Sequence, residues 1–444
     1  MNLLPSQIAA IVGAPYIIES PACSSAYAVQ GRSPALVAAP ATVEELSRVV
    51  AAAYVAGMSV VPYGGGTMQE WGRPPAADFL LVQLARLKRV LIYEPDDLTI
   101  SVEAGLTLDA LGETLAANGQ MLPLDLPAPA STTVGGALAT AMDGPRRLGY
   151  GTARDLLIGV QVVEADGRIS KAGGMVVKNV SGFDMMKLYT GSLGSLAIIA
   201  SANFKLIPRP RAAATIACAC KSASAAFALA RAIHASQLTP VAVEYIAQGE
   251  GGRMPDKGLS EALPPLILPA SCLLCVRAEG LPAAVERHVR DVAELAERVG
   301  ASAISVLRDE AHTASWAAIN DLARSDDLAA DEVLLRLSCL PADLGRALVA
   351  ANSLATRHGL HLQMVARALS GLAYLRLQGD EPQLRTYYGE LLVAWPHLTL
   401  LAGPPALKAD LPIWGTDLPN LDLMRRIKQE FDPHNRLNSG RYVV

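Results

Sequence analysis

The stretch Pro62-Tyr63-Gly64-Gly65-Gly66-Thr67 decides the fold, because it puts three consecutive glycines directly after an apolar segment. Glycine has no Cβ, so the backbone of such a loop can approach a ligand closely and aim several N–H groups at one anion. The hydroxyl of Thr67 is a further potential donor. A flexible turn uses the same residues, so the loop by itself leaves both interpretations open.

The residues before this loop predict a helix and then a strand. Thr42 and Glu45 have the spacing of a capping box, and apolar residues recur on one helical face as far as Tyr54. Gly57 is expected to end the helix, and Met58–Pro62 predicts a short buried strand. The loop has neither the Gly-Lys-Ser/Thr ending of a P-loop nor the Gly-x-Gly-x-x-Gly pattern of a Rossmann unit, which excludes both motifs.

A second glycine-rich stretch, Ser131–Gly136, lies in the same half of the chain. Two loops of this kind predict one elongated ligand that is held at two points. Further glycines follow at expected strand edges, in Gly149–Gly151 and Gly191–Gly194. Val160–Glu164 and Arg168–Lys171 predict a hairpin with an Asp-Gly turn.

Composition limits the classes of function. The 444 residues are 51% hydrophobic with a net charge of −4, and no basic run or basic aromatic face suggests nucleic acid as a partner. No apolar run is long enough to predict a transmembrane segment. The N-terminus lacks a basic region before its apolar residues, so no secretory signal is expected. Six cysteines form no disulfide framework, which favours the cytoplasm, with peripheral attachment at the inner membrane through partners left open.

Beyond Pro210 the pattern changes to strands that alternate with alanine-rich helices. Residues 213–307 have the order βαββαβ, and residues 333–402 repeat that order more loosely. The cysteines of this half, Cys218, Cys220, Cys272 and Cys275, suggest either a metal site or buried core. Residues three apart on a strand point to opposite faces, which favours core, and no metal site is predicted.

Residues 40–210 resemble the FAD-binding domain of the vanillyl-alcohol oxidase and p-cresol methylhydroxylase (PCMH) superfamily. The resemblance rests on Pro62–Thr67, Glu103-Ala-Gly105, Thr133–Gly136, Gly149–Gly151 with Arg154-Asp155, and Gly191–Ile199. It implies an α+β fold with a two-subdomain PCMH-type domain at 40–210, after an N-terminal segment at 1–39. A cap domain of ferredoxin-like βαββαβ units then covers 211–444, and its C-terminal tail returns to the FAD domain.

Within this superfamily the nearest likeness is to the FAD-binding E subunits of glycolate oxidases. The stretches that carry it are Thr67–Pro75, Gly144–Arg147, Val177–Asp184, Lys187–Gly191 and the ending Phe431–Arg441. Two departures concern substrate oxidation. Gly191-Ser-Leu-Gly194 stands where catalytic D subunits have Gly-Ser-Glu-Gly, and Arg367–Gly371 stands where the E-type pattern has His-Ala-Gly-Asn-Gly. No catalytic residue is assigned.

The resemblance implies that the first loop holds the FAD pyrophosphate. The second loop and Gly149–Asp155 would follow the phosphates toward the isoalloxazine, with Ala197–Ile199 at the adenine end. Neither loop has a histidine or cysteine for a covalent bond, so FAD is expected to be held non-covalently. The predicted FAD-binding residues are Tyr63, Gly64, Gly65, Gly66, Thr67, Met68, Ser131, Thr132, Thr133, Gly135, Gly136, Gly149, Gly151, Arg154, Asp155, Gly194 and Ile198.

Several other side chains have two interpretations each. Lys178 and Asn179 are predicted either near the flavin ring or as structural support, and Trp71 either at the cofactor edge or in the core. Arg146 and Arg147 are expected to meet flavin phosphate or a partner's acidic patch, or else to be solvated.

Three functions follow from the resemblance. The first is an FAD-binding subunit of a glycolate-oxidase-like 2-hydroxyacid dehydrogenase complex, which carries electrons between a catalytic flavoprotein and an iron–sulfur subunit. The second is a self-sufficient FAD-dependent 2-hydroxyacid dehydrogenase. The third is a non-catalytic assembly subunit that retains the flavin fold. The partners implied are the catalytic FAD subunit, the iron–sulfur subunit and a small 2-hydroxyacid.

Overall fold

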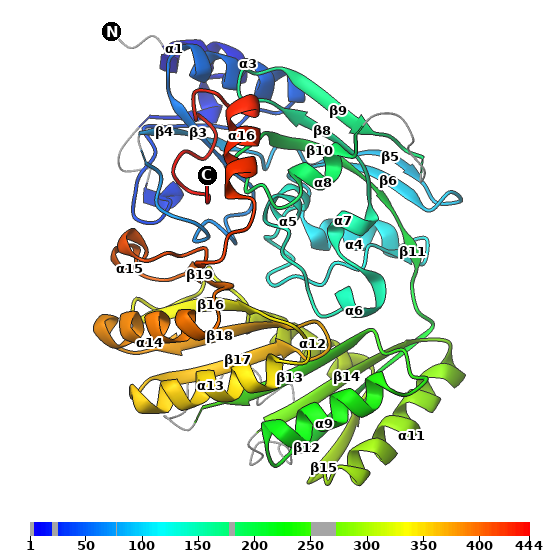
Figure 1. The fold of residues 1–444 in the computed structure, drawn as a ribbon. Coiled ribbons are helices and arrows are strands. Elements are labelled where there is room, and N and C mark those ends of the chain that lie inside the picture. Colours follow the sequence, from blue (N-terminus) through cyan, green and yellow to red (C-terminus); the bar gives the residue numbers. More distant parts are fainter. Residues whose placement is uncertain (1–3, 20–24, 77, 177–182, 250–271) are drawn as a thin grey trace. The chain divides into compact units, whose positions relative to one another are not determined.

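The computed structural model describes residues 4–19, 25–76, 78–176, 183–249 and 272–444, and the chain divides into two compact units (Figure 1). The N-terminal unit comprises Met1–Asp143, Thr152–Arg209 and Leu418–Val444, whereas the C-terminal unit comprises Gly144–Gly151 and Pro210–Asp417. Residues 1–39 group with the N-terminal unit, and residues 144–151 group with the C-terminal unit. The expected domain boundaries stay a prediction.

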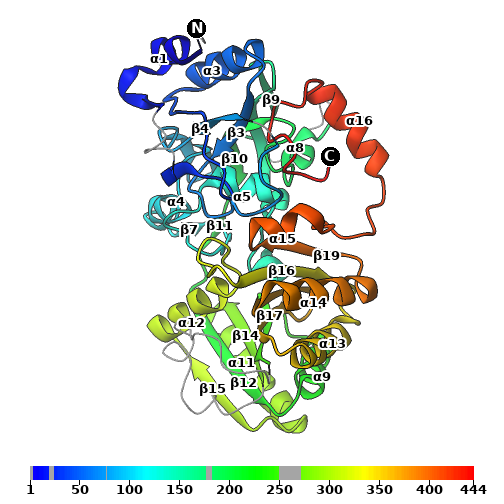
Figure 2. The same cartoon turned by 90° about the vertical axis from the view of Figure 1, so that its left-hand side faces the viewer.

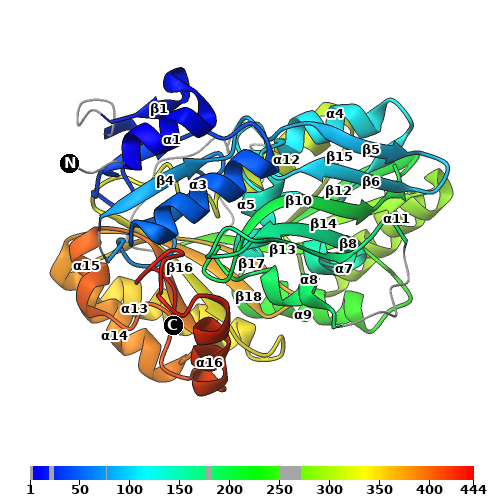
Figure 3. The same ribbon diagram turned by 90° about the horizontal axis from the view of Figure 1, so that it is seen from above.

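The first half of the N-terminal unit is a four-stranded sheet covered by helices. Its order is β1-β2-β4-β3, and β2, β4 and β3 run parallel. The Thr42 hydroxyl caps α3 by accepting from the N–H of Glu45, whose carboxylate accepts from the N–H of Ala41. Helices α1 and α3 lie side by side over this sheet (Figure 3), and their apolar faces share its core. The bounds are α1 Leu4–Val12, β1 Ile17–Ile18, β2 Leu36–Ala38, α3 Val43–Val55, β3 Ser59–Tyr63 and β4 Phe79–Gln83.

The second half is a five-stranded antiparallel sheet of order β5-β6-β10-β8-β9. The predicted hairpin is confirmed as β8 and β9, and Gly167 in its turn has a φ of +90°, which suits glycine. The bounds are β5 Val90–Glu94, β6 Thr99–Glu103, α4 Leu108–Ala116, β7 Gln120–Met121, α5 Val134–Thr140, α7 Ala153–Leu156, β8 Leu157–Val163, β9 Ile169–Gly173, α8 Met185–Tyr189, β10 Ile198–Lys205 and β11 Ile207–Pro208.

The C-terminal tail, residues 418–444, belongs to the N-terminal unit. It contains α16 (Leu421–Phe431), after which the chain runs along β3, where Leu437 pairs with Val60 in a parallel bridge. The N–H of Val60 donates to Arg436 O at 2.8 Å, and the N–H of Asn438 donates to Val60 O at 2.9 Å. Figure 2 shows α16 and the C-terminus in red.

The C-terminal unit is built on one eight-stranded antiparallel sheet of order β15-β12-β14-β13-β17-β18-β16-β19. Each half has the strand order of a ferredoxin-like βαββαβ unit, and the halves join where β13 pairs with β17. The predicted repeat is thus confirmed. The bounds are α6 Arg147–Tyr150, β12 Ala212–Cys220, α9 Ala223–His234, β13 Ala242–Gln248, β14 Cys272–Gly280, α11 Pro282–Arg298, β15 Ala303–Leu307, α12 Asp309–Asp321, β16 Glu332–Ser338, α13 Leu344–Arg357, β17 His361–Arg367, β18 Leu372–Gln378, α14 Glu381–Ala394, β19 Leu398–Ala402 and α15 Pro405–Asp410.

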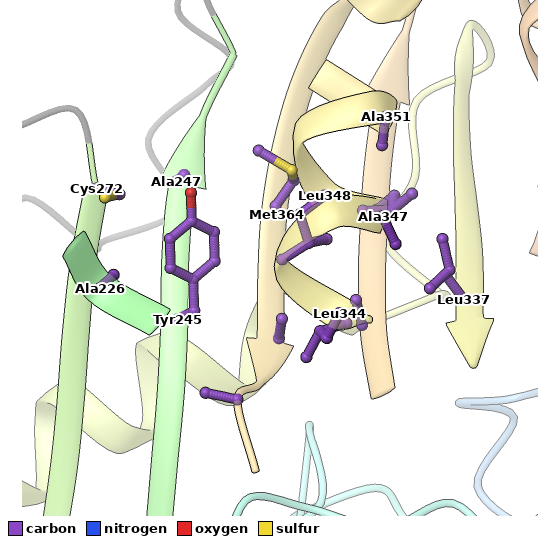
Figure 4. Close-up of a cluster of buried hydrophobic side chains, with 14 of the residues drawn as sticks. Ala226, Tyr245, Ala247, Cys272, Leu337, Leu344, Ala347, Leu348, Ala351 and Met364 are labelled. Carbon is purple, nitrogen blue, oxygen red and sulfur yellow. The ribbon is translucent and has the colours of Figure 1, made fainter. Parts of the chain in front are cut away.

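Helices α9, α11, α13 and α14 contribute to a single core with alternate residues of this sheet. Figure 4 shows part of it, with Leu344, Leu348 and Met364 packed together and Tyr245 near Cys272. The thiols of Cys218, Cys220 and Cys272 belong to this core, and burial raises the pKa of Cys218 to about 12. Among the described residues no helix is long and apolar enough to cross a membrane.

Candidate FAD site

The two glycine loops meet in the N-terminal unit, and the close approach depends on glycine. A Cβ on Gly64 would lie 2.3 Å from the Thr133 hydroxyl, and one on Gly65 would lie 1.7 Å from the carbonyl oxygen of Ser131. Gly66 has a φ of +83°, which other residues rarely adopt. The sequence of the first loop is therefore required by its contact with the second loop.

The first loop keeps backbone donors available. In the described part of the chain, the N–H groups of Gly64, Gly65 and Gly66 donate to no backbone carbonyl oxygen outside the regular helices and strands. Consecutive N–H groups in such a turn form a concave site that suits an anion. This donor set fits a phosphate of FAD, as the loop sequence predicts.

A partly open pocket with a volume of about 90 Å³ lies against these loops. Whole small-molecule sites occupy roughly 300–1,000 Å³, so a pocket of this size fits one segment of an elongated cofactor and not the whole molecule. Ten predicted residues line it, namely Gly64, Gly65, Gly66, Thr67, Met68, Thr133, Gly135, Gly136, Gly194 and Ile198. Trp71, Ala197 and Ile199 line it as well. Its described lining contains no histidine or cysteine, and non-covalent attachment stays a prediction.

Three of the predicted residues, Tyr63, Ser131 and Thr132, contact residues of the loops but are not among those that line the pocket. The Thr132 hydroxyl bonds to the Thr67 hydroxyl at 3.1 Å and to Pro127 O at 2.8 Å, and Thr132 is fully buried. The carbonyl oxygen of Ser131 limits the space at Gly65, and the Tyr63 hydroxyl lies where a Cβ of Gly66 would be. These contacts set the shape of the loops, and a contact of the three residues with FAD stays a prediction.

Gly149 and Gly151 belong to the C-terminal unit and are not among the residues that line the pocket. Gly149 packs against Val241, the residue before β13: a Cβ would lie 2.8 Å from the Cα of Val241, and the Gly149 N–H donates to Val241 O at 3.2 Å. Gly151 ends α6 with a φ of +82°. Their glycine character is explained by packing and chain reversal, and a role toward FAD stays a prediction.

Arg146 has a structural partner that the sequence did not reveal. Its guanidinium bonds to the buried Glu279 carboxylate at 2.7 Å, and the Arg277 guanidinium and the Tyr150 hydroxyl donate to the same group at 2.6 and 2.8 Å. Although burial acts to raise the pKa of Glu279, Arg277 and Arg146 hold that pKa below its usual value. These contacts tie residues 144–151 to the sheet of the C-terminal unit.

Arg154 and Asp155 lie in the short helix α7, outside the pocket lining. The Asp155 carboxylate caps this helix by accepting from the N–H and the hydroxyl of Thr152, both at 2.8 Å, and these bonds lower the pKa of Asp155. Their predicted contact with FAD stays a prediction. Lys178 and Asn179 lie outside the described residues.

The tail supplies pocket residues that the sequence prediction missed. Asn438 and Arg441 line the pocket, together with Gln69 from the extended first loop. The Arg441 guanidinium donates to the Gln69 side chain at 2.8 Å and to the carbonyl oxygens of Gln69 and Trp71 at 2.6 and 2.9 Å. The resemblance of Phe431–Arg441 to related endings was the available signal, but it assigned no role to individual residues.

The tail is held in place by a buried ion pair. Lys428 Nζ donates to Asp432 Oδ2 at 2.5 Å and to the carbonyl oxygens of Ser195 and Leu437 at 2.8 and 3.1 Å. Asp432, which is 1% exposed, also accepts from the N–H groups of Arg436 and Leu437. Burial lowers the pKa of Lys428, and the contact with Asp432 opposes that shift.

Two domain families match most of the chain. Residues 34–183 match the FAD binding domain, and residues 209–382 with 416–442 match the C-terminal domain of FAD linked oxidases. The chain is 26% identical to glycolate oxidase subunit GlcD of Bacillus subtilis, over 92% of this chain and 88% of that protein. It is 34% identical to glycolate oxidase subunit GlcE of Escherichia coli, over 34% of this chain and 43% of that protein.

Solved structures show the same fold. A structure of p-cresol methylhydroxylase with substrate bound matches with a TM-score of 0.75 and 14% identity, over 99% of this chain and 96% of that one. The chain thus belongs to the FAD-linked oxidases and is an FAD-dependent oxidoreductase with the fold of the PCMH-type flavoproteins.

Proposed function

We propose that this chain is the FAD-binding subunit of a glycolate-oxidase-like 2-hydroxyacid dehydrogenase complex. In this role it carries electrons between a catalytic flavoprotein and an iron–sulfur subunit. FAD suits the work because it accepts two electrons as a hydride and releases them singly. The similarity to two differently named glycolate oxidase subunits supports both the substrate class and membership of a complex.

The observation that supports leaving substrate oxidation to a partner is Arg367, the last residue of β17. It is 4% exposed, its guanidinium lies 5.0 Å from the centre of the Tyr374 ring, and it stands opposite Glu244 in the β13–β17 register. The E-type pattern that this stretch resembles has a histidine at the position of Arg367. A guanidinium keeps its proton at neutral pH and accepts no hydrogen bond, so Arg367 cannot take the hydroxyl proton of a substrate.

One observation favours the self-sufficient dehydrogenase as a second candidate. The match to the D subunit extends over most of both chains, whereas the match to the E subunit covers less than half of either. In that case a base from elsewhere in the chain must remove the hydroxyl proton, since oxidation of a hydroxyacid needs one within hydrogen-bonding reach.

Anaerobic reduction separates these functions. The purified chain is loaded with FAD, mixed with glycolate or D-lactate, and followed by the visible absorbance of the flavin. We expect the flavin to stay oxidised with the chain alone and to be reduced once the catalytic partner is added. Rapid bleaching by the chain alone would overturn the electron-transfer role in favour of the self-sufficient enzyme.

A control with dithionite tests whether the bound flavin can be reduced at all. Reduction by dithionite but not by substrate fits the proposal. A chain that stays colourless with added FAD, or whose flavin is not reduced by the complete complex, would point to the assembly role.

A further inference from the structure

Arg441 is a buried cation without a carboxylate partner. The residue is 5% exposed, and its guanidinium donates only to neutral oxygens of Gln69, Trp71 and Asn438. Among the described residues no carboxylate lies within 4.0 Å of it, and Arg441 Nε has no acceptor. Burying a charge costs free energy unless an opposite charge and hydrogen bonds compensate it. No carboxylate of the described residues therefore compensates this cation by direct contact.

The guanidinium nevertheless stays protonated. Burial lowers the pKa of Arg441 to about 10, and Glu70 acts in the opposite direction at longer range. A pKa of about 10 leaves the group charged at neutral pH. The protein thus keeps a positive charge where water cannot fully solvate it.

This charge lines the same pocket as the glycine loop. Arg441, Gly64, Gly65 and Gly66 are all among its lining residues, and the N–H groups of the three glycines are the uncommitted backbone donors described above. A cation and a row of N–H groups around a space of about 90 Å³ match a compact, multiply charged anion. The pyrophosphate is the part of FAD with that chemistry.

Arg441 reaches the pocket only because the tail is docked. The N–H of Arg73 donates to Arg441 O at 3.0 Å, and the N–H of Ala76 donates to Ser439 O at 3.1 Å. The Lys428–Asp432 pair fixes the start of this segment. Backbone hydrogen bonds therefore join the extended first loop to the tail, and the Arg441 guanidinium adds side-chain hydrogen bonds to Gln69 and Trp71 of that loop.

We propose that Arg441 is the counter-cation of the FAD pyrophosphate, and that FAD binding is thereby coupled to docking of the C-terminal tail. Binding the anion compensates the buried charge, so FAD stabilises the docked tail. By thermodynamic linkage, a docked tail must raise the affinity for FAD by the same factor.

The first test compares FAD with riboflavin, which has the same ring system but no phosphate. Flavin fluorescence quenching gives both dissociation constants for the wild type, Arg441→Gln, Arg441→Lys and the control Arg425→Gln. Arg425 is an exposed arginine of the same tail. We expect Arg441→Gln to raise the Kd of FAD about 100-fold and leave that of riboflavin within about twofold, because only FAD loses a charge-assisted contact. Arg441→Lys should recover part of the FAD affinity, and Arg425→Gln should change neither.

Equal weakening of FAD and riboflavin by Arg441→Gln would overturn the proposal, since it would show that Arg441 only shapes the loop. An unchanged FAD affinity would overturn it as well. If Arg441→Gln does not fold, the Kd of FAD is measured at several ionic strengths for Arg441→Lys and for the wild type. We expect FAD affinity to fall with ionic strength in both proteins, because both keep a positive charge at this position. An FAD affinity independent of salt in both proteins would contradict an ionic contact.

The second test measures the tail directly. Arg425 and Arg426 are exposed in α16 and provide tryptic sites. FAD should slow cleavage there in the wild type and in Arg425→Gln, in which Arg426 remains, but not in Arg441→Gln. Riboflavin should give little protection. Cleavage that is insensitive to FAD in the wild type would refute the coupling.

Discussion

Two deeply buried arginines, one in each unit, have opposite surroundings. Arg376 in β18 is 1% exposed and bonds to Glu332 at 2.8 Å and to Asp327 at 3.1 Å, with the carbonyl oxygen of Asp327 as a further acceptor. Arg441 in the tail is 5% exposed and bonds only to neutral oxygens. The C-terminal unit compensates Arg376 with its own carboxylates, whereas Arg441 in the N-terminal unit lies at a pocket without a carboxylate in contact.

This difference separates structural charge from charge that serves a ligand. A cluster with its own carboxylates reaches its lowest free energy without any other molecule. A buried cation among neutral oxygens reaches its lowest free energy only when an anion binds beside it. The free-energy cost of burying that charge is therefore present before the ligand binds and is compensated by the ligand. The partners of the two arginines, which distinguish them, are not visible in the sequence around either residue.

The largest expected effect comes from removing Arg376 from its cluster with Glu332 and Asp327. Arg376→Met leaves Glu332 and Asp327 without their cation, and we expect a loss of about 3–5 kcal/mol in the free energy of unfolding. Denaturant unfolding followed by circular dichroism measures it. Arg287→Met removes an exposed pair with Asp291 and should cost less than about 1 kcal/mol. Similar losses of stability in the two variants would show that the buried Arg376 cluster stabilises the unit no more than an exposed ion pair does.

The next effect concerns a buried group that the C-terminal unit keeps neutral. The Thr215 hydroxyl accepts from Trp316 Nε1 and shares a second hydrogen bond with His312 Nδ1, each at 2.8 Å. Burial, then Arg277, lowers the pKa of His312 to about 4. The unfolded chain therefore binds the extra proton first, and stability should fall as the pH falls from about 6.5 to about 4, by on the order of 3 kcal/mol.

Unfolding free energies measured across this pH range test the histidine. His312→Asn should flatten the profile, whereas His234→Asn, which changes an exposed histidine of the same unit, should leave it unchanged. An equally steep profile in His312→Asn would assign the acid sensitivity to other groups.

A smaller effect is expected from separating the two glycine loops. Gly65→Ala places a Cβ 1.7 Å from the Ser131 carbonyl oxygen, so one loop must move away from the other. We expect the Kd of FAD to rise about 100-fold, equivalent to about 2.7 kcal/mol, with the fold retained. Fluorescence quenching and circular dichroism measure the two quantities. Because this change acts on shape, riboflavin binding should weaken too, in contrast to Arg441→Gln.

The smallest effect provides the matched control for a glycine substitution. Gly112 lies inside α4, and a Cβ there meets nothing within 4 Å. Gly112→Ala should raise stability by up to about 1 kcal/mol, because alanine is the better helix former, and leave FAD affinity unchanged. A thermal melt and a flavin titration check this. A changed FAD affinity would mean that the loss in Gly65→Ala is not specific to the loop.

Local signals predicted the elements and their order well. The cap at Thr42, the end of the helix at Gly57 and the glycine loop after β3 depend on neighbouring residues, and the structure places them close to their predicted positions. The βαββαβ repeat was likewise predicted from periodicity. Ten of the predicted cofactor residues line one pocket, and eight of them lie in two short stretches whose glycines are needed for contact, whereas Gly194 and Ile198 come from a third stretch.

Long-range partners were beyond local signals. Gly149 and Arg146 are near glycine-rich segments in the sequence, yet the structure pairs them with Val241 and Glu279, which lie far along the chain in the same C-terminal unit. The distance along the chain between Arg441 and Gln69 is similarly large. The amino-acid sequence alone does not show which carboxylate, if any, will form an ion pair with a given arginine.

The sequence by itself predicted the two glycine loops and the order of the elements, because glycine patterns and apolar periodicity are local constraints on the backbone. Its resemblance to known flavoproteins then implied the family and the cofactor. The tertiary structure decided which cations are compensated and which are not. That property depends on packing of distant segments, since a charge separated from water is stabilised only by the groups that the fold brings within a few ångströms of it. For this protein, it distinguishes Arg376, which stabilises a unit, from Arg441, which we propose binds the cofactor.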